Sequence, residues 1–225
     1  EALARWRTKT GEMIMPGRFV PPLENIGYVV DLDFYIYEQL LRAMKRWKKA
    51  GKELFTISTN FSRRNFESGG KNFAGRLKRM ADHYGIDPKY IEVEVTESVV
   101  VENVDELKRV LSELEKFGFR IAIDDFGTGY SNLHCIRDMN PSYVKMDRDF
   151  TAKAMNSDRD YELYKNIIPM VHSINVRICA EGIEEREWLL KMKEMKVDYL
   201  QGYYFGRPCG KEQFLQQYAS GIHVK

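Results

Sequence analysis

The chain has 225 residues, of which 44% are hydrophobic and 12% aromatic, so it can bury a substantial core in one large domain or two small ones. Its 35 Lys and Arg residues nearly balance 33 Asp and Glu residues, and the net charge of +2 favours neither a nucleic-acid polymer nor a membrane surface. Three widely spaced cysteines argue against a disulfide framework and favour a reducing, cytoplasmic compartment. No apolar run approaches the ~20 residues of a membrane span, so we expect no membrane contact from this segment.

The first third of the chain is predicted to contain two helices. We expect a short strand or turn over 1–6, a loop marked by Pro and Gly up to residue 22, a helix over 31–49, a strand over 54–59 and a helix over 73–84. The helix over 31–49 rests on the apolar spacing of Leu32, Ile36, Leu40, Met44 and Trp47. The basic residues between 42 and 52 then form its solvated face rather than a polyanion site.

The rest of the chain alternates β-favouring runs with amphipathic segments. Strands are expected over 91–97, 121–124, 143–147, 176–180 and 197–200. Helices are expected over 103–117, from 133 to 140, over 158–174, over 188–195 and over 212–220, with a kink or break at Pro169. The polar residues at the strand ends are Asn60, Glu94, Asp124, Lys145, Glu181 and Gln201.

This spacing predicts an α/β fold, a modified (β/α)8 barrel. Such a barrel allots roughly 30 residues to each strand–helix unit and gathers the C-terminal ends of its strands around one mouth, where its active sites lie. A doubly wound open sheet is the alternative, but it would bring together only the strand ends near its switch point.

Two adjacent carboxylates, Asp124 and Asp125, end an apolar run and precede a glycine loop at Gly127 and Gly129. Like charges at the rim of a core repel each other and lose solvation, whereas a divalent cation makes the pair favourable. Taken alone, the pair is explained as well by a strand end that caps the next helix. The rest of the chain favours a metal site.

Acidic and amide side chains dominate the predicted barrel mouth. They are Glu1, Asn60, Glu94, Asp124, Asp125, Asp147 and Glu181, and Lys145 is the cation among them. Oxygen donors without a His or Cys cluster favour Mg²⁺ or Mn²⁺ over Zn²⁺, and so many acids predict more than one ion. Paired ions suit phosphodiester hydrolysis, because one activates a bound water and both stabilise the attacking and leaving oxygens. Lys145 would orient the hydroxide or bind the phosphate.

Several motifs in order resemble those of bacterial EAL domains. They are Glu1-Ala2-Leu3-Ala4-Arg5-Trp6, Asn60-Phe61-Ser62, Glu94-Val95-Thr96-Glu97, Asp124-Asp125-Phe126-Gly127-Thr128-Gly129-Tyr130-Ser131, Lys145-Met146-Asp147, Ala180-Glu181-Gly182-Ile183-Glu184 and Gln201-Gly202-Tyr203. The resemblance implies a modified (β/α)8 barrel that hydrolyses cyclic di-GMP to linear pGpG with Mg²⁺ or Mn²⁺, usually as a homodimer.

The resemblance also implies residue roles. Glu1, Asn60, Glu94 and Asp124 resemble ligands of a first metal ion, and Asp124, Asp125, Asp147 and Glu181 those of a second. Lys145 would hold the nucleophilic water, Glu181 would act as general base, and Glu97 would anchor the 125–131 loop between the metal site and the dimer interface. The substrate-binding candidates are Arg5, Asn60, Asp125, Lys145, Glu184 and Gln201.

The departures from the family pattern are small. Phe61, Asn132 and Ile183 replace the common Leu, Ser and Val, and none of these changes removes a ligand. An active phosphodiesterase is therefore predicted. The alternative is a non-catalytic cyclic di-GMP receptor or protein-interaction module of the same fold. Another Mg²⁺-dependent barrel would rest on fold analogy alone and would leave the motif order unexplained.

The number of strand ends predicts an incomplete barrel. Seven can be counted, beginning with Glu1-Ala2-Leu3, whereas eight strands close a barrel. We therefore expect residues 1–225 to form a single EAL-type barrel domain that lacks its first strand. The full-length protein would be cytoplasmic or anchored to a membrane through an upstream segment.

Overall fold

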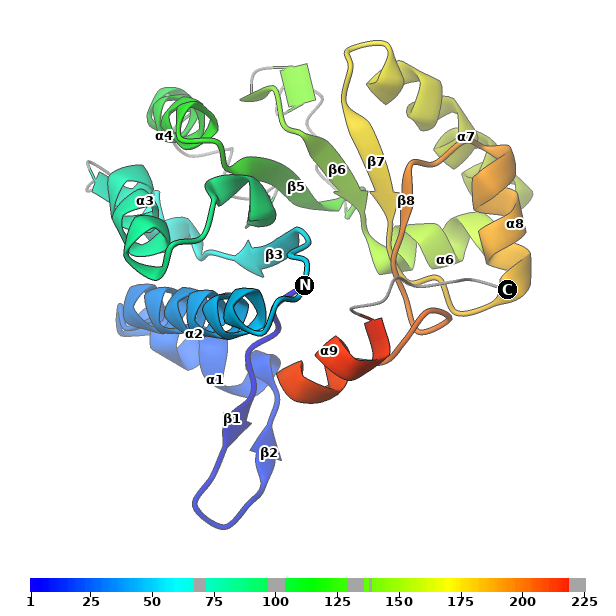
Figure 1. Cartoon of the computed structure of the whole chain (residues 1–225). Coiled ribbons are helices and arrows are strands. Elements are labelled where there is room, and N and C mark those ends of the chain that lie inside the picture. Colours follow the sequence, from blue (N-terminus) through cyan, green and yellow to red (C-terminus); the bar gives the residue numbers. More distant parts are fainter. Residues whose placement is uncertain (67–71, 97–103, 129–135, 138, 219–225) are drawn as a thin grey trace. The chain divides into compact units, whose positions relative to one another are not determined.

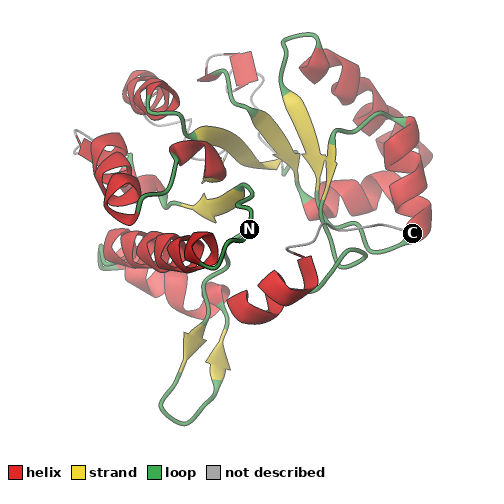
Figure 2. Ribbon diagram, in the orientation of Figure 1, coloured by secondary structure: helices red, strands yellow, loops and turns green. Residues whose placement is uncertain are grey.

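The computed structural model describes the chain except for residues 67–71, 97–103, 129–135, 138 and 219–225 (Figure 1). The chain divides into two compact units, Glu1–Val95 with Glu102–Arg120, and Thr96–Val101 with Ile121–Lys225. Figure 2 shows that strands alternate with helices along most of the chain. The first unit holds β1 (Trp6–Arg7), β2 (Met13–Ile14), α1 (Pro16–Asn25), α2 (Val29–Lys49), β3 (Ile57–Asn60), η1 (Arg63–Asn65), α3 (Phe73–Tyr84), η3 (Pro88–Tyr90), β4 (Ile91–Thr96) and α4 (Val104–Lys116).

The first residues lie beside β3. Ala2 forms a parallel bridge with Thr59, and its N–H donates to the Ser58 carbonyl at 2.8 Å. The expected strand at 1–6 is thus reduced to one bridge. Trp6 instead begins an antiparallel hairpin of β1 and β2.

The predicted loop up to residue 22 is wrong, because α1 begins at Pro16. A proline in the first helical turn loses no intrahelical hydrogen bond, since its N–H would have no partner there. Pro21 and Pro22 lie inside the helix, and Phe19 is buried with an edge-to-face contact to Trp6, 5.6 Å between ring centroids. Aromatic packing therefore supports a short helix whose sequence carries breaker residues.

Helix α2 confirms the predicted helix over 31–49, but its buried face is rotated from the predicted stripe. Leu32 and Ile36 are only half-buried, whereas Asp33, Phe34 and Tyr37 are buried. Tyr37 donates its hydroxyl to the Leu77 carbonyl of α3 at 3.2 Å. A carboxylate on the apolar face of a helix needs polar partners, and it becomes important for the site.

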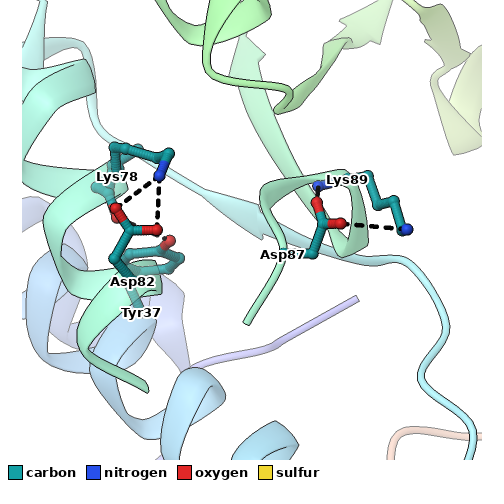
Figure 3. A network of polar contacts seen from close by, with 6 residues as sticks. Tyr37, Lys78, Asp82, Asp87 and Lys89 are labelled. Atoms are coloured by element: carbon teal, nitrogen blue, oxygen red, sulfur yellow. Dashed lines mark hydrogen bonds and ion pairs between the residues drawn. The ribbon is translucent and has the colours of Figure 1, made fainter. Parts of the chain in front are cut away.

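Helix α3 follows its predicted bounds and ends at Gly85, which has φ +68°. Figure 3 shows the polar contacts near this end: Lys78 pairs with Asp82 at 2.6 Å, and Asp87 caps η3 by accepting from the Lys89 N–H at 3.0 Å. Such exposed pairs contribute little stability each. The Lys78–Asp82 pair lies within α3, whereas the Asp87 cap starts the short η3 helix that leads directly into β4.

The second unit holds β5 (Arg120–Phe126), β6 (Tyr143–Met146), α6 (Arg148–Asn156), α7 (Asp158–His172), β7 (Arg177–Ala180), α8 (Arg186–Glu194), β8 (Tyr199–Leu200) and α9 (Lys211–Tyr218). Strands β5, β6, β7 and β8 pair in parallel in chain order, as β3 and β4 do in the first unit. Apolar residues of β5, β6 and β7, among them Ile121, Ile123, Val144 and Ile178, are fully buried, as is typical of parallel strands covered on both faces. The predicted α/β class with parallel strands is confirmed.

Two features of the second unit differ from expectation. Helix α6 lies where no helix was predicted, and α7 runs through Pro169 without ending there.

Cys179 is buried and Cys209 is partly buried, while Cys135 falls outside the described residues.

Candidate functional site

Glu1 and Asn60 meet at the end of β3. The Asn60 side-chain amide donates to Glu1 Oε1 at 2.8 Å, and the Ala2 bridge to Thr59 fixes the backbone that carries Glu1. Both side chains are exposed. Two of the predicted oxygen donors of the first unit therefore lie in direct contact, although they are 59 positions apart in the chain.

Glu94 lies at the same level on the neighbouring strand. The register of the parallel pair places Asn60 opposite Glu94, and the Phe61 N–H donates to the Glu94 carbonyl at 3.4 Å. Glu94 is only 1% exposed. A carboxylate with this degree of burial requires compensation by charge or hydrogen bonds, as a ligand of a cation would receive.

The segment after Asn60 is held by a residue that sequence reasoning missed. Asp33 of α2 uses one oxygen, Oδ2, to accept from the Ser62 N–H at 2.8 Å and from the Asn65 side-chain amide at 2.7 Å. The Ser62 hydroxyl donates to Glu24 of α1 at 2.6 Å. Burial raises the pKa of Asp33 to about 7, against the lowering effect of these two hydrogen bonds. The available signal was an acid on the apolar face of a predicted helix.

Asp124 and Asp125, the adjacent acids of the second unit, lie in different environments because strand β5 is irregular. Ile123 pairs with Val144 and Phe126 with Met146, so the register shifts between these two pairs. Asp125 takes φ +59°, in the left-handed region that non-glycine residues rarely adopt. Asp124 is buried and Asp125 is exposed. A local bulge thus aims only the first carboxylate inward, as bulges beside functional sites often do.

Lys145 joins the ends of three strands. Its Nζ lies 2.7 Å from Glu181 Oε1 on the residue after β7 and 3.2 Å from Asp124 Oδ1 on β5. Lys145 itself is buried at the end of β6. A buried ammonium between two carboxylates offsets part of their desolvation, and it presents fixed positive charge at the strand ends. The sequence-predicted cation and two predicted acids are therefore brought together.

Asp147 has a structural task in addition to its predicted one. Its Oδ1 caps α6 by accepting from the Asp149 N–H at 2.9 Å and the Phe150 N–H at 3.1 Å. The Asp147 N–H donates to the Phe126 carbonyl at 3.0 Å. A cap of this kind stabilises a helix start by about 1 kcal/mol. This helix-capping role was not predicted from the sequence, and a metal-binding role for the second oxygen of Asp147 stays a prediction.

The predicted substrate-binding residues occupy different settings. Arg5 donates to the neighbouring Ala4 carbonyl at 2.7 Å, Glu184 is exposed, and Gln201 is half-buried. The Gln201 carbonyl accepts from the Ile183 N–H at 3.0 Å. A Cβ on Gly202 would lie 2.1 Å from the Ile183 carbonyl oxygen, so this glycine permits the close packing of the two turns.

Glu97 and the Gly129–Ser131 part of the acidic loop lie outside the described residues. The role of Glu97 as loop anchor therefore stays a prediction.

The donor chemistry of the predicted set fits a hard divalent cation, because every candidate offers oxygen. Three candidates belong to the first unit, Glu1, Asn60 and Glu94, and four to the second, Asp124, Asp125, Asp147 and Glu181. Within the described ranges, no group of three or more His, Cys, Asp or Glu side chains is arranged to hold one ion. The residue types thus fit a metal, and the ligand set remains a prediction.

None of the helices in the described part of the chain is long and apolar enough to cross a membrane.

Comparison with known proteins agrees with the motif order. A sequence model described as EAL domain matches residues 1–208. Signaling protein YkoW of Bacillus subtilis (strain 168) is 34% identical over 216 residues, covering 96% of this chain and 27% of that protein. Cyclic di-GMP phosphodiesterase NbdA of Pseudomonas aeruginosa is 32% identical over 221 residues, covering 97% of this chain and 28% of that protein. The chain therefore spans little more than a quarter of the length of these curated relatives.

Solved structures share the fold. The structure described as "PaMucR Phosphodiesterase, c-di-GMP complex" gives a TM-score of 0.87 with 29% identity, covering 95% of this chain and 85% of that one. The predicted modified (β/α)8 class is consistent with this likeness and with the parallel strands of both units. With the match over residues 1–208, the chain belongs to the EAL domain family.

Proposed function

We propose that this chain hydrolyses cyclic di-GMP to linear pGpG in a metal-dependent reaction, and so lowers the level of a bacterial second messenger. One observation carries the proposal: a buried lysine, Lys145, contacts Asp124 and Glu181 at three strand ends of an EAL-family chain. Relatives named as cyclic di-GMP phosphodiesterases, and a related structure described as a cyclic di-GMP complex, support the choice of substrate.

The reaction requires water to attack a phosphorus atom as a P–O ester bond breaks. Glu181 has an oxygen 2.7 Å from Lys145 Nζ, and we assign it as the acceptor of the water proton. Lys145 supplies fixed positive charge toward the attacking oxygen and the phosphoryl oxygens, whose negative charge increases in the transition state. Both groups are presented by strand ends, which limits the reorganisation they need during the reaction.

Mg²⁺ or Mn²⁺, with two ions as the proposed number, would be held by Glu1, Asn60, Glu94, Asp124, Asp125, Asp147 and Glu181. Such ions activate water and stabilise the attacking and leaving oxygens of phosphodiester hydrolysis when they are bound. Within the chain, the burial of Glu94 and Asp124 suits ligands of this kind, because a dry carboxylate gains more from a cation than a hydrated one.

The assembly and surroundings are also proposals. We propose a homodimer that acts in the cytoplasm, with Arg5, Glu184 and Gln201 contacting the nucleotide. Glu97 and the loop it is predicted to anchor would link the metal site to the dimer interface. The balanced charge of the chain, +2, supports a small anionic ligand bound at a specific site more than a nucleic-acid polymer.

The test is incubation of the purified chain with cyclic di-GMP and either Mg²⁺ or Mn²⁺, followed by separation of the nucleotides. Appearance of pGpG that stops when the metal is chelated supports the proposal. Recovery of the intact cyclic nucleotide from a chain that binds it would instead identify a receptor. The Asp124→Asn variant serves as the matched control, because it keeps the side-chain shape and removes the charge.

A further inference from the structure

The beginning of α6 contacts two of the turns that carry predicted site residues. The helix starts directly after β6, at the cap formed by Asp147. One turn is the bulged end of β5, with Asp124, Asp125 and Gly127; the other is the Glu181–Gly182 turn after β7. All of these residues belong to the second unit.

Phe150 lies against the first turn. A Cβ added to Gly127 would lie 2.4 Å from Phe150 Cδ1, so the ring occupies the space that any other residue at position 127 would fill. Gly127 also has φ +102°, a conformation that requires glycine. The Phe150 ring also packs against the ring of Tyr164 in α7, with 5.1 Å between the two ring centroids, and Tyr164 is fully buried.

Arg148 lies against the second turn. A Cβ on Gly182 would lie 2.1 Å from Arg148 Cγ and 3.2 Å from its Cα, so the contact involves the aliphatic stem and backbone of the arginine. Gly182 has φ +74°. The side chain of Arg148 is largely exposed, and its Nε lies 3.6 Å from Asp149 Oδ1. The stem therefore packs on the turn beside Glu181, while the charged end extends toward solvent.

We propose that Arg148 and Phe150 are positioning residues, which fix the two acidic turns against one rigid helix start. This inference rests on the proposed function. The Asp147 cap fixes the helix to β6, the Phe150 ring sets the backbone that carries Asp124 and Asp125, and the Arg148 stem sets the backbone that carries Glu181. Lys145 contacts Asp124 and Glu181, so a shift of either turn changes the geometry around its ammonium.

The proposal assigns the stem of Arg148, not its charge, to this task. Arg148→Met keeps an unbranched chain and removes the guanidinium, whereas Arg148→Ala removes both. We expect Arg148→Ala to lower kcat about tenfold with little change in KM, because small displacements of catalytic groups have large effects on rate. Arg148→Met should recover most of that loss. Arg159→Ala, at an exposed position of α7, is the matched control and should leave kcat unchanged.

Phe150 is tested by a double-mutant cycle with Gly127. Phe150→Ala should lower kcat at least tenfold, and Gly127→Ala should lower it further, because its Cβ meets the ring and its φ is unfavourable. The double variant should lose less than the sum of the two single losses, since no ring remains to be displaced. Phe150→Leu should lie between wild type and Phe150→Ala.

Two further measurements distinguish a positioning role from a general loss of stability. The first of them also tests that role independently of which reaction the chain catalyses. Affinity for Mn²⁺ alone, measured by calorimetry without nucleotide, should weaken in Arg148→Ala and Phe150→Ala and recover in Arg148→Met. The denaturant midpoint of each variant gives its folded fraction under assay conditions. A wild-type chain that fails to cleave cyclic di-GMP would refute the proposed function, but the Mn²⁺ affinities would still test the positioning role.

Equal losses in Arg148→Met and Arg148→Ala would overturn the inference for Arg148, because they would assign its effect to charge. Additive losses in the Gly127 and Phe150 cycle would overturn it for Phe150. Losses of kcat that merely follow the unfolded fraction, with Mn²⁺ affinity unchanged, would reduce both residues to ordinary packing.

Discussion

Two buried aspartates in the chain have the same exposure and opposite surroundings. Asp33 on α2 and Asp124 on β5 are each 8% exposed. Asp33 is contacted by neutral donors, the Ser62 N–H and the Asn65 amide, and burial raises its pKa to about 7. Asp124 instead lies 3.2 Å from the ammonium of Lys145.

Burial of a carboxylate therefore does not by itself mark a functional site. Neutral donors hold Asp33 in place, and a proton can relieve the cost of its charge. The Lys145 ammonium offsets part of the desolvation of Asp124, and we propose that this carboxylate also binds a metal ion. We therefore propose a structural role for Asp33 and a role in the reaction for Asp124.

The largest expected effect is on turnover in Asp124→Asn. The change removes a charge at the strand ends and preserves the shape of the side chain, so we expect kcat to fall about 10³-fold, in the range seen when a preorganised electrostatic group is removed. Stability should fall less than in Lys145→Met, because Lys145 keeps Glu181 as a carboxylate partner at 2.7 Å. Asp33→Asn, measured in the same assay at pH 8, should retain most activity. Similar losses in both variants would erase the distinction between the two acids.

Lys145→Met should have the next largest effect, on stability. It leaves the buried Asp124 and the partly buried Glu181 without the ammonium, and breaking a buried pair by removing one partner costs about 3–5 kcal/mol. Urea unfolding measures the loss. Lys165→Met, at an exposed position of α7, is the control, with an expected change below about 0.5 kcal/mol. A stable Lys145→Met chain would mean that the two acids do not depend on this cation.

Asp33→Asn should change the pH dependence of stability. The folded-state pKa of Asp33, about 7, exceeds its ordinary value of 3.8, so the folded protein holds the proton more tightly than the unfolded chain. This contribution to stability is present at low pH and is lost as pH rises through about 7. The asparagine variant keeps one oxygen to accept both hydrogen bonds and has no proton to lose.

Relative to wild type, Asp33→Asn should therefore gain stability between pH 4 and pH 8. The expected gain is about 2–4 kcal/mol, because each unit of pKa shift corresponds to about 1.4 kcal/mol. Urea unfolding at several pH values gives the difference curve. A stability difference that does not change with pH would show that the pKa of Asp33 is the same in the folded and unfolded chains.

The smallest effect is expected for Ser62→Ala. It removes the hydroxyl bond to Glu24, 2.6 Å long, and the longer bond, 3.3 Å, in which the hydroxyl accepts from the Arg64 N–H, but it keeps the backbone N–H that binds Asp33. A loss of about 1–2 kcal/mol is expected, because one hydrogen bond usually contributes about 1 kcal/mol. A much larger loss would show that the hydroxyl, rather than the backbone of this segment, carries the contact with the first helices.

The sequence singled out the candidate acids because each lies in a short local motif at the end of an expected strand. From the sequence, Asp124 and Asp125 were expected to have the same role, whereas in the structure Asp124 is buried and Asp125 is exposed. This difference arises from the register shift after Ile123, which is set by pairing with β6 rather than by local sequence. Asp33 was missed because its partner, Ser62, lies 29 positions away. The position of Asp33 on the apolar face of a predicted helix was a local signal, but it could not identify Ser62 as the partner.

The two missed helices have different causes. Pro16, Pro21 and Pro22 suggest a loop, but a helix can begin at one proline and continue where tertiary packing of Phe19 offsets the lost hydrogen bonds. Helix α6 begins with Asp147 as its cap, and that residue was interpreted only as a metal ligand. One oxygen of a carboxylate was enough for the cap, so a structural role and a proposed chemical role fall on the same side chain.

We propose that Lys145 and Glu181 act as one unit on the water that cleaves cyclic di-GMP. The most direct test measures kcat for Lys145→Met, Glu181→Gln and the double variant, with folded protein confirmed in each case. Groups that act together lose their effect together, so the double variant should be about as slow as the slower single variant. Losses that multiply in the double variant would show that the two residues contribute independently, and would contradict the account.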